Sequence, residues 1–479
     1  MEENKTAEEC KNEGNNYFKK SEYPQALEWY NKAYELDSDS TKAAVYLSNR
    51  SFCHLKMENF GLAIADANLA EEKDPKYVKA FYRQGQALFL LGKLEEARNS
   101  FLKAKKLLPS DADIIKKLKI LKELITKKKF EEAISVPDAP KDLDLNWEEM
   151  TVPSSYDGPR METLDEPITS EWCVKLMDHM KDQKKLHKKY VTMLLIRAKE
   201  ILKAQETLVD FEVPEGQEIT VCGDTHGQYY DLLNIFSING NPSDTNPYLF
   251  NGDFVDRGSF SVEVMLCLLA WKVSNPNAMH LTRGNHETRN MNKLYGFEGE
   301  VIAKYDQKTF EFFSDIFWYL PLAYVLNKTV QVNHGGLFQQ DGVKLDQIRK
   351  INRFGEPPES GLFSDIIWSD PSESPGRTMS KRGVSCQFGP DITKKYLEDN
   401  GLSLLVRSHE MKQEGYEEQH NGKCITIFSA PNYCDQMGNK GAFIRFKGGE
   451  MKPKFTQFTA VEHPKVPPMA YAKSFYNMF

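Results

Sequence analysis

Two patterns of apolar and polar positions follow one another along the chain. In the first quarter, apolar residues recur at helical spacing and small residues return at regular intervals. From about residue 170 to 460, short β-type apolar runs alternate with polar turns that often contain glycine. The stretch between them, 135–168, is rich in Pro and Asp and shows no sustained period, so it is predicted to be a linker. The chain is therefore predicted to be multidomain, with a helical region ahead of an α/β domain.

The helical region repeats itself with a period of about 34 residues. Gly14, Ser51 and Gly85 each precede an alanine by twelve positions, and a second alanine follows seven positions after the first. This period is that of tetratricopeptide repeats, in which small residues let paired helices approach closely. The sequence predicts an all-α solenoid over 1–134, with repeats at about 7–40, 41–76 and 77–110 and a capping helix after them.

Six apolar runs in the second region each end in a polar turn. "EITVC" leads to "GDTHG", "PYLF" to "NGDFVDRG", "NAMHL" to "TRGNHE", "KTVQV" to "NHGG", "SLLV" to "RSHE" and "CITIF" to "SAPNYC". Strands that deliver polar residues at their carboxyl ends are how α/β proteins assemble one site from distant sequence. The residues so delivered are Asp224, His226, Asp253, Asp256, Asn285, His286, His334 and His409.

These side chains are typical of a metal site. The chain has ten histidines, and four of them fall in these turns, which argues against a set of unrelated turn residues. Oxygen and imidazole ligands without thiolate suit Mn, Fe, Zn or Mg. There are too many ligands for one catalytic ion with an open position, so a dinuclear site with one bridging carboxylate is predicted. Arg257 directly follows Asp256, Arg382 lies in "SKRGVSC", and both are suited to bind phosphate oxygens bidentately.

Composition narrows the class of protein. The 479 residues are 40% hydrophobic and 11% aromatic, which is enough to fill packed cores. A net charge of −7 argues against a general nucleic-acid surface, and the longest apolar run, "MLCLLAW", is too short to cross a bilayer. The eight cysteines form no CxxC pair, and the polar N-terminus does not resemble a signal peptide. We expect a cytoplasmic monomer, with nuclear entry left open because "TKKKF" is the one basic cluster.

The turn motifs resemble the signatures of a known family. "GDTHGQ", "GDFVDRG" and "GNHE", followed in order by "HGG", "RSHE" and "SAPNYC", are similar to those of the phosphoprotein phosphatase family of metal-dependent Ser/Thr phosphatases. The three repeats ahead of them resemble those of the tetratricopeptide-repeat member of that family. "RSHE" in place of "RAHQ" is a departure that keeps His409. The resemblance implies a catalytic domain over 169–460, with a central β-sandwich flanked by helices, and a regulatory tail over 461–479.

The resemblance also implies a role for each turn residue. One ion would be held by Asp224, His226 and Asp253, and the second by Asp253, Asn285, His334 and His409. A hydroxide bridging the ions would attack the phosphorus of phosphoserine or phosphothreonine in a phosphoprotein. His286 would protonate the leaving oxygen and Asp256 would orient its imidazole. Phosphate would be bound by Arg257, Arg382, Asn285 and His409, with Tyr433 at the mouth of the site.

The repeats are expected to bind an acidic peptide. Their first helices carry cations and amides that resemble the "carboxylate clamp" holding the C-terminal tails of chaperones such as heat-shock protein 90. The positions that match are Lys11, Asn15, Asn49, Lys79 and Arg83. The array is also expected to fold over the metal site and block it, with Glu58 reaching the active-site arginines. A chaperone tail or a fatty acid would release this block.

Three other functions are weighed against these expectations. A cysteine-based phosphatase is excluded because no cysteine is followed six positions later by arginine. A metallophosphoesterase acting on nucleotides or diesters would share the Asp-His and Asn-His turns, but would not be expected to carry "SAPNYC" or a peptide-binding array. A protein that only docks on chaperones is disfavoured by the complete ligand set.

Overall fold

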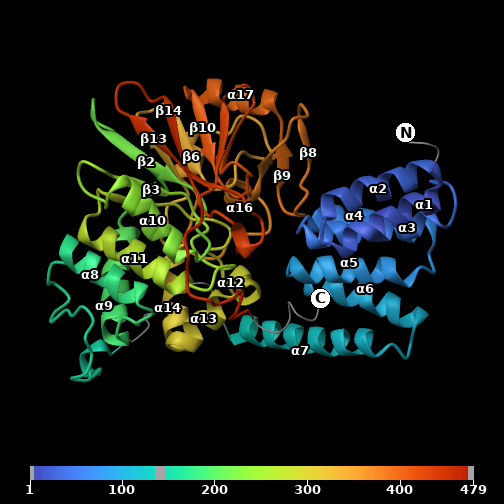
Figure 1. Cartoon of the computed structure of the whole chain (residues 1–479), viewed down its shortest axis with the longest axis horizontal. Coiled ribbons are helices and arrows are strands. Elements are labelled where there is room, and N and C mark those ends of the chain that lie inside the picture. The colour runs from blue at the N-terminus through green and yellow to red at the C-terminus, as the bar shows by residue number, and fades with distance from the viewer. Residues whose placement is uncertain (1–4, 135–145, 473–479) are drawn as a thin grey trace. The chain divides into compact units, whose positions relative to one another are not determined.

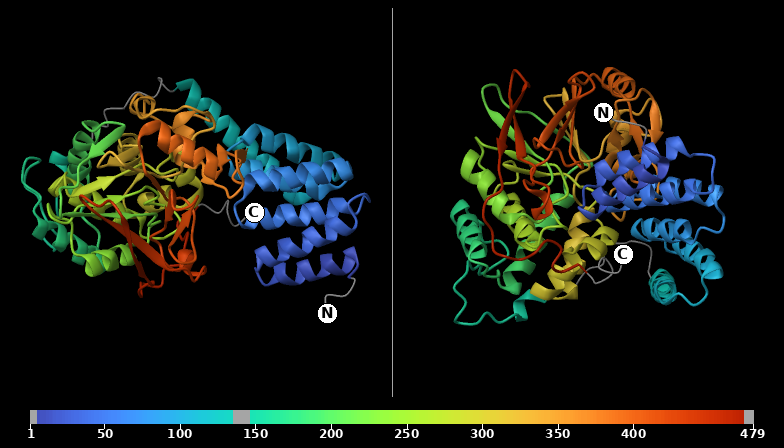
Figure 2. Two further views of the ribbon diagram at one scale, coloured as in Figure 1. Left: turned by 90° about the horizontal axis from the view of Figure 1, so that it is seen from above. Right: turned by 45° about the vertical axis from the view of Figure 1, so that its right-hand side comes forward.

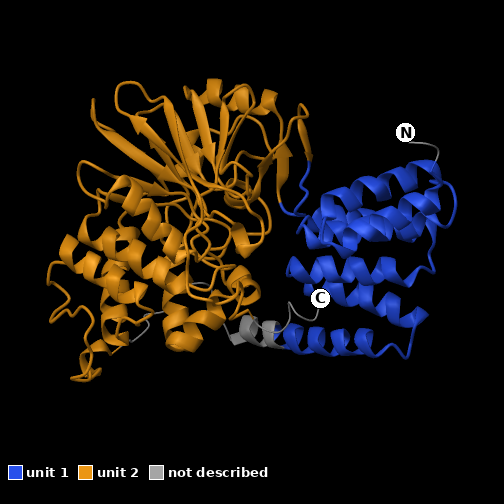
Figure 3. Cartoon of the chain, viewed as in Figure 1, with its two compact units in different colours: residues 1–138, 379–384, 479 blue, residues 139–378, 385–478 orange. Residues whose placement is uncertain are grey.

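The computed structural model describes residues 5–134 and 146–472. By its contacts the chain divides into two compact units, shown in different colours in Figure 3. Unit 1 comprises 1–138 together with 379–384, and unit 2 most of the remainder. The first residues of the predicted linker, 135–145, and the last of the predicted tail, 473–479, lie outside the described residues. No described helix has both the length and the apolar character needed to span a bilayer.

Unit 1 contains three antiparallel helix pairs and a longer seventh helix (Figure 1). The predicted tetratricopeptide-type solenoid is therefore confirmed. Its helices are α1 (Ala7–Lys19), α2 (Tyr23–Leu36), α3 (Ala43–Lys56), α4 (Phe60–Lys73), α5 (Val78–Leu90), α6 (Leu94–Leu107) and α7 (Ala112–Ile134).

Small residues let the helices of each pair approach closely. Gly14 of α1 faces Tyr30 of α2, and a Cβ added to this glycine would lie 2.6 Å from the ring. Ser51 of α3 is fully buried and donates its hydroxyl to the carbonyl oxygen of Ala63 in α4, at 2.7 Å. The spacing of small residues and alanines that marks the repeat in the sequence is thus the spacing of helix–helix contacts.

Unit 2 is built on two main sheets. The five-stranded sheet has the order β14-β13-β2-β3-β4, in which β2, β3 and β4 run parallel. The six-stranded sheet has the order β1-β5-β6-β10-β12-β11, in which β6, β10 and β12 run parallel. The bounds are β1 (Leu208–Phe211), β2 (Glu218–Cys222), β3 (Tyr248–Phe250), β4 (Met279–Leu281), β5 (Ala323–Leu326), β6 (Val330–Asn333), β10 (Leu404–Arg407), β11 (Tyr416–Gln419), β12 (Cys424–Ile427), β13 (Gly441–Lys447) and β14 (Pro453–Phe458).

The two sheets pack face to face and helices cover their outer faces (Figure 2). Between the sheets lies a core rich in branched aliphatic residues, including Val221, Val332 and Ile427. A larger core joins the five-stranded sheet to its helices, and a smaller one joins the six-stranded sheet to its own. Unit 2 is therefore the predicted β-sandwich flanked by helices.

The helices of the first outer layer are α8 (Ser170–Lys181), α9 (Lys188–Lys203), α10 (Tyr229–Asn239), α11 (Ser261–Ser274), α13 (Phe297–Lys304) and α14 (Gln307–Trp318). On the other side lie α15 (Leu345–Arg349), α16 (Leu362–Trp368) and α17 (Pro390–Asn400). The short helix α12 (Arg289–Tyr295) follows the turn after β4. A small third sheet is formed by β7 (Asp370–Pro371), β8 (Arg377–Met379) and β9 (Cys386–Phe388), and two 3-10 turns span Trp147–Glu149 and Tyr433–Asp435.

Residues 461–472 after β14 lie against the rest of unit 2 as an irregular strap. The backbone N–H of Val461 donates to the Asp231 carboxylate at 3.0 Å. Ser259 donates its hydroxyl to the carbonyl oxygen of Pro467 at 2.6 Å. The N–H of Met469 donates to the carbonyl oxygen of Arg257 at 2.8 Å, so the strap contacts the turn that carries this arginine.

Candidate metal centre

The carboxyl ends of six strands supply the candidate site. In the five-stranded sheet, β2 is followed by Asp224 and His226, β3 by Asp253, and β4 by Asn285. In the six-stranded sheet, His334 follows β6, while β10 and β12 lead to His409 and Tyr433 respectively. Because parallel neighbours end at one edge of a sheet, each sheet presents its ligands as a group, and the sandwich brings the two groups together.

The turns that carry these residues hold an unusual backbone conformation. His226, Asp253, Asp256, Arg257 and His409 all have positive φ, between 39° and 71°. Residues other than glycine rarely adopt positive φ. Such strained conformations are frequent at functional sites, where the surrounding structure enforces them.

Glycine is required at one position beside them. Gly252 has φ 81°, and a Cβ there would lie 2.6 Å from the backbone nitrogen of Gly284 and 2.8 Å from His334. The turns after β3 and β4 can therefore approach each other closely only with glycine at this position.

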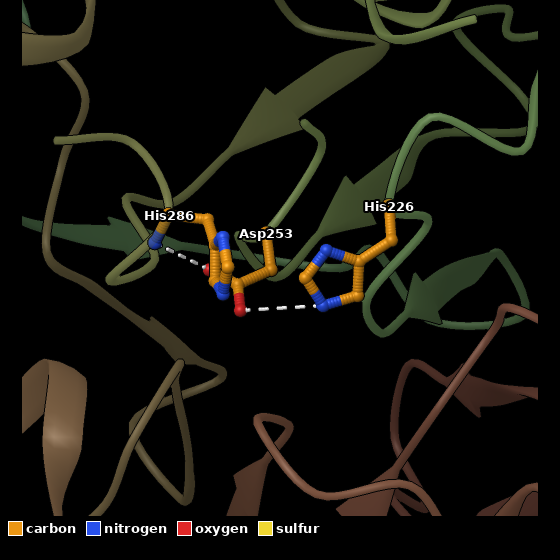
Figure 4. Close-up of side chains that lie close together, drawn as sticks. All are labelled: His226, Asp253 and His286. Atoms are coloured by element: carbon orange, nitrogen blue, oxygen red, sulfur yellow. Dashed lines mark hydrogen bonds and ion pairs between the residues drawn. The ribbon is translucent and has the colours of Figure 1, made fainter. Parts of the chain in front are cut away.

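Asp253 lies between His226 and His286 (Figure 4). Its Oδ2 is 3.6 Å from Nε2 of His226 and 3.2 Å from Nε2 of His334. Two groups of side chains have donor atoms close enough to share an ion, and Asp253 belongs to both. One group contains His226 and His286, the other His334 and His409. A carboxylate common to two ligand groups is what a bridging ligand requires.

Hydrogen bonds on the far side of two imidazoles orient them toward Asp253. Nδ1 of His226 lies 3.0 Å from the carbonyl oxygen of Val255, and Nδ1 of His334 lies 2.8 Å from that of Asn251. A carbonyl can only accept, so each Nδ1 carries the proton and each Nε2 presents its lone pair. Metal-ligating histidines are held in this way.

Acceptor atoms converge beside Asn285. Its Oδ1 lies 3.0 Å from Nε2 of His334, which is itself 3.2 Å from Nδ1 of His409. If the carboxamide were turned over, its nitrogen would lie within 3.1 Å of both these imidazole nitrogens and of Asp253 Oδ2. Three atoms with lone pairs therefore lie around one end of the Asn285 carboxamide: the two imidazole nitrogens and Asp253 Oδ2. Lone pairs that converge in this way can coordinate a cation, so the residues present fit a metal ion.

The electrostatics of the site also fit cations. Asp224 is 1% exposed, and burial together with the charge of Asp253 raises its pKa to about 8. Burial lowers the pKa of His226 well below its usual value and also lowers that of His334, so both imidazoles are neutral and able to coordinate. Nearby cations would favour the charged form of the buried carboxylates.

His286 and Asp256 form a hydrogen-bonded pair beside this cluster. Nδ1 of His286 is 2.8 Å from Oδ2 of Asp256, and the imidazole ring is 4.8 Å from that of His226, centroid to centroid. Burial raises the pKa of Asp256 to about 7, while hydrogen bonds from Phe297 N–H and from Asn292 act to lower it. Because Nδ1 is bonded to the carboxylate, Nε2 is the atom of His286 that can transfer a proton to a substrate.

The predicted phosphate ligands are placed unequally. The guanidinium of Arg257 lies 3.8 Å from the centroid of the Tyr295 ring, which in turn lies 5.2 Å from the ring of His286. The ring of Tyr433 lies 5.2 Å from that of His226, and its place at the mouth of the site stays a prediction. Arg382 lies in the segment 379–384, which belongs to unit 1, and its contact with phosphate stays a prediction.

Sequence reasoning gave no role to Glu287, the last residue of "GNHE". Its fully buried carboxylate accepts the backbone N–H groups of Asp253, Phe254 and Gly284, each at 2.8 Å. Glu287 thereby fixes the turn that carries the shared Asp253 and ties it to the turn of Asn285. Glu287 lies in a polar turn between Arg283 and Arg289, and no local sequence pattern distinguishes it from an exposed turn residue.

Sequence reasoning also gave no role to Asn251. This residue is the hydrogen-bond partner of Ser408, the serine of "RSHE" that stands where relatives have alanine. Its amide donates to the carbonyl oxygen of Asn333 at 3.0 Å and to Oγ of Ser408 at 2.9 Å. The backbone carbonyl oxygen of Asn251 accepts the hydrogen bond from Nδ1 of His334. Glu410, the other unusual residue of "RSHE", accepts a hydrogen bond of 2.9 Å from the buried Arg407. Both changes therefore have hydrogen-bond partners next to the site without removing a ligand.

The predicted clamp residues lie on α1, α3 and α5. Asn15, Asn49 and Arg83 are spaced by one repeat each, and Asn49 Nδ2 is 3.4 Å from Asn15 Oδ1. The guanidinium of Arg83 stacks over the Phe52 ring at 3.4 Å, and burial lowers its pKa to about 10, which still leaves it charged at neutral pH. Lys79 is exposed. Lys11 forms an ion pair with Glu8 on the same helix.

Glu58 lies in the turn between α3 and α4, with φ 60°. Its predicted contact with the active-site arginines stays a prediction.

Comparisons with known proteins show which family the chain belongs to. Residues 218–413 match the model of the calcineurin-like phosphoesterases, 118–210 the PPP5 TPR repeat region, and 78–111 a tetratricopeptide repeat. The chain is 50% identical over 476 residues to serine/threonine-protein phosphatase 5 of Homo sapiens, covering 99% of this chain and 94% of that protein. It is 49% identical to serine/threonine-protein phosphatase T of Trypanosoma brucei brucei, covering 98% of each.

A solved structure of a Saccharomyces cerevisiae protein serine/threonine phosphatase, described as similar to human phosphatase PP5, aligns with a TM-score of 0.61. It is 42% identical and covers 63% of this chain and 100% of its own.

Fold and site together define a metallophosphoesterase of the calcineurin-like class, which depends on divalent metal ions. At half identity over nearly its whole length, the chain belongs to the serine/threonine-protein phosphatase 5 family. It is a metal-dependent protein-serine/threonine phosphatase with an N-terminal tetratricopeptide-repeat domain.

Proposed function

We propose that the strand-end cluster hydrolyses phosphoserine and phosphothreonine in proteins with the help of two divalent cations. The observation that carries this proposal is the position of Asp253, whose Oδ2 faces the Nε2 atoms of His226 and His334 from two different sheets. Asp224, His226 and Asp253 would hold one ion, and Asp253, Asn285, His334 and His409 would hold the other. When bound, the cations supply Lewis acidity toward phosphate and a nucleophile from water at neutral pH.

The side chains around the ions bind the phosphate and transfer the proton. Arg257, Arg382 and the side chains of Asn285 and His409 bind the phosphate oxygens, because guanidinium, amide and imidazole N–H groups can all donate hydrogen bonds to them. His286 donates a proton from Nε2 to the departing serine or threonine oxygen, while Asp256 accepts the hydrogen bond from Nδ1 and stabilises the charged imidazole. An assay on a phosphoserine peptide with added manganese tests the activity directly.

A specific observation favours one rival role for His286. Its donor atoms lie close enough to those of His226 and Asp253 to complete a ligand group, so His286 itself could hold a metal. We favour the proton-transfer role because Nδ1 of His286 faces the carboxylate of Asp256, which can stabilise a charged imidazole, whereas carbonyl oxygens hold His226 and His334. The two roles predict opposite effects on metal content, which decides between them.

We further propose that the repeats bind the acidic C-terminal tail of heat-shock protein 90-type chaperones. The support comes from unit 1 itself, in which Asn15, Asn49 and Arg83 occupy equivalent positions of stacked first helices and Lys79 lies on the third. Amides and cations on adjacent turns can hold a terminal carboxylate and acidic side chains together. Burial of Arg83 against Phe52 fixes its planar group in advance.

Replacing Lys79 by glutamate is expected to abolish binding of an acidic chaperone C-terminal peptide. The exposed ammonium makes its contribution through charge, and glutamate reverses that charge within the proposed clamp. Isothermal titration calorimetry with the peptide measures the change. Lys103→Glu, an exposed lysine on the second helix of the same repeat, is the matched control and should leave the affinity within about threefold. Unaltered affinity in Lys79→Glu would remove the clamp.

We also propose that the repeat domain lowers basal activity, with Glu58 opposing the active-site arginines, and that a chaperone tail or a fatty acid relieves this block. An acidic side chain can occupy the place of a phosphate, which is the physical support for Glu58.

Deleting residues 1–150 is therefore expected to raise turnover of a phosphoserine peptide severalfold. The measurement compares kcat of the truncated and the full chain under identical metal loading. Glu58→Gln in the full chain should reproduce part of the increase, because it removes the charge and keeps the shape. A truncated enzyme no faster than the full chain would rule out autoinhibition.

The ligand set accepts Mn²⁺, Fe²⁺ or Fe³⁺, Zn²⁺ and Mg²⁺, and we propose that the ions in the cell come from this group. We also propose a location in the cytoplasm, for which the support is a sequence with eight cysteines and no CxxC pair.

A further inference from the structure

Asn292 lies behind the pair of His286 and Asp256. It belongs to the short helix α12, and its side chain has no exposure to solvent. Its amide nitrogen donates to Asp256 Oδ2 at 3.1 Å and to the carbonyl oxygen of His286 at 2.7 Å. One NH₂ group therefore contacts both residues that the proposed mechanism assigns to proton transfer.

The bonds around Asp256 leave its carboxylate one orientation. Oδ1 accepts the backbone N–H of Phe297 at 2.9 Å, while Oδ2 accepts Nδ1 of His286 at 2.8 Å and the amide of Asn292 at 3.1 Å. The backbone N–H of Asp256 donates to Oγ of Ser261 at 3.1 Å. Asn292 is the one of these groups that also fixes the backbone of His286, so it couples the position of the carboxylate to that of the imidazole.

Only a donor fits where the Asn292 nitrogen lies. Both atoms that it contacts are acceptors, so turning the carboxamide over would place its oxygen against the Asp256 carboxylate and the His286 carbonyl. An aspartate of the same shape would meet the same repulsion. A leucine would fill a similar volume but would leave both acceptors without this donor.

We propose that Asn292 is a positioning residue that holds His286 in line for proton donation to the leaving oxygen. This inference rests on the proposed acid role of His286. The two hydrogen bonds of Asn292 go to Asp256 and to the His286 carbonyl oxygen, neither of them an assigned metal ligand, so it acts through the orientation of the imidazole. Misplacement of a catalytic group by about 1 Å can lower a rate about a hundredfold.

The test compares two substrates that differ in their need for an acid. Phosphoserine leaves as an alkoxide and requires a proton, whereas 4-nitrophenyl phosphate releases a stable anion that departs without one. In the full-length, metal-loaded protein, Asn292→Ala is expected to lower kcat for a phosphoserine peptide about tenfold to a hundredfold. For 4-nitrophenyl phosphate the loss should stay below about threefold, with KM little changed for either substrate.

A double-mutant cycle adds a readout that a purely structural role would not produce. In the His286→Asn background, Asn292→Ala should lower kcat for the peptide by less than about threefold, because the group that it positions is already gone. Metal content should equal that of the parent. If Asn292→Ala folds poorly, Asn292→Leu gives the same comparison with the volume kept.

Asn239→Ala is the matched control. This half-buried asparagine of α10 donates to Thr220 and Tyr248 at 2.9 Å each, away from the ligands, and its loss should not alter the ratio of the two activities. The positioning role would be overturned if Asn292→Ala lowered kcat equally for both substrates. It would also be overturned if the losses in kcat of the two single variants multiplied fully in the double variant, or if Asn292→Ala lost metal. If His286→Asn itself leaves peptide turnover unchanged, the proposed acid fails first, and the two failures are thus told apart.

Discussion

Replacing His286 by asparagine is expected to lower turnover of a phosphoserine peptide by about two to four orders of magnitude while leaving the metal content unchanged. Asparagine can still donate a hydrogen bond to Asp256, but it cannot deliver a proton to the leaving oxygen. Turnover of 4-nitrophenyl phosphate should fall much less, since its leaving group needs no proton. The measurement is kcat for both substrates on protein whose metal has been quantified by elemental analysis.

His334→Asn serves as the matched variant for this experiment. His334 is also a buried histidine, but its Nε2 faces Asp253 and its Nδ1 is held by the backbone, as expected of a ligand. This variant should lose metal and should lose activity on both substrates alike. If His286→Asn also loses metal, His286 is a ligand of the group that it forms with His226 and Asp253. Peptide turnover within about threefold of the parent would refute the acid role.

Removal of divalent ions by a chelator is expected to abolish turnover of both substrates, and added Mn²⁺ should restore it. Without cations the buried carboxylates repel one another, and this repulsion adds to burial in raising the pKa of Asp224 to about 8. In the proposed mechanism the nucleophile is a water molecule that the cations activate, so turnover stops without them. Elemental analysis before and after chelation, in parallel with the activity, gives the number of ions on which turnover depends.

Two ligand variants test the shared carboxylate. Asp253→Asn should weaken both ions, because Oδ2 faces ligands from both groups, whereas Asp224→Asn should chiefly weaken the ion held with His226. The expected metal content is therefore lower for Asp253→Asn than for Asp224→Asn at the same free metal concentration. Equal contents would contradict a bridging role, and dephosphorylation that continues in metal-free protein would contradict the whole mechanism.

Much of the fold could be predicted from sequence because its signals are local. The small residue Gly14, which contacts Tyr30, belongs to a spacing of small residues that recurs three times in the sequence. Each strand that leads to the site is a short apolar run followed by a polar turn. The turn residues could be grouped from their positions along the chain because strand ends meet at one sheet edge. The partition of the strands into two sheets depends on pairings between distant segments, such as β6 with β10, which no local pattern specifies.

The supporting residues of the site could not be predicted for the same reason. Glu287 accepts hydrogen bonds from Asp253 and Phe254, more than thirty positions earlier, and Asn251 reaches Ser408 across 157 positions. An asparagine or glutamate in a turn is common, and only its buried partners distinguish it from an exposed one. Asn292 lies in a helix of ordinary composition, so its two acceptors became visible only in three dimensions.

The ligands of the centre are divided between two layers that touch mainly through side chains such as Val221, Val332 and Ile427. The thickness of this apolar core therefore sets the distance between the two groups of metal ligands. A substitution that adds or removes a methyl group in this core would change that distance, although it lies far from the reacting atoms. The affinity for metal ions therefore depends on the whole sandwich and not on the six loops alone.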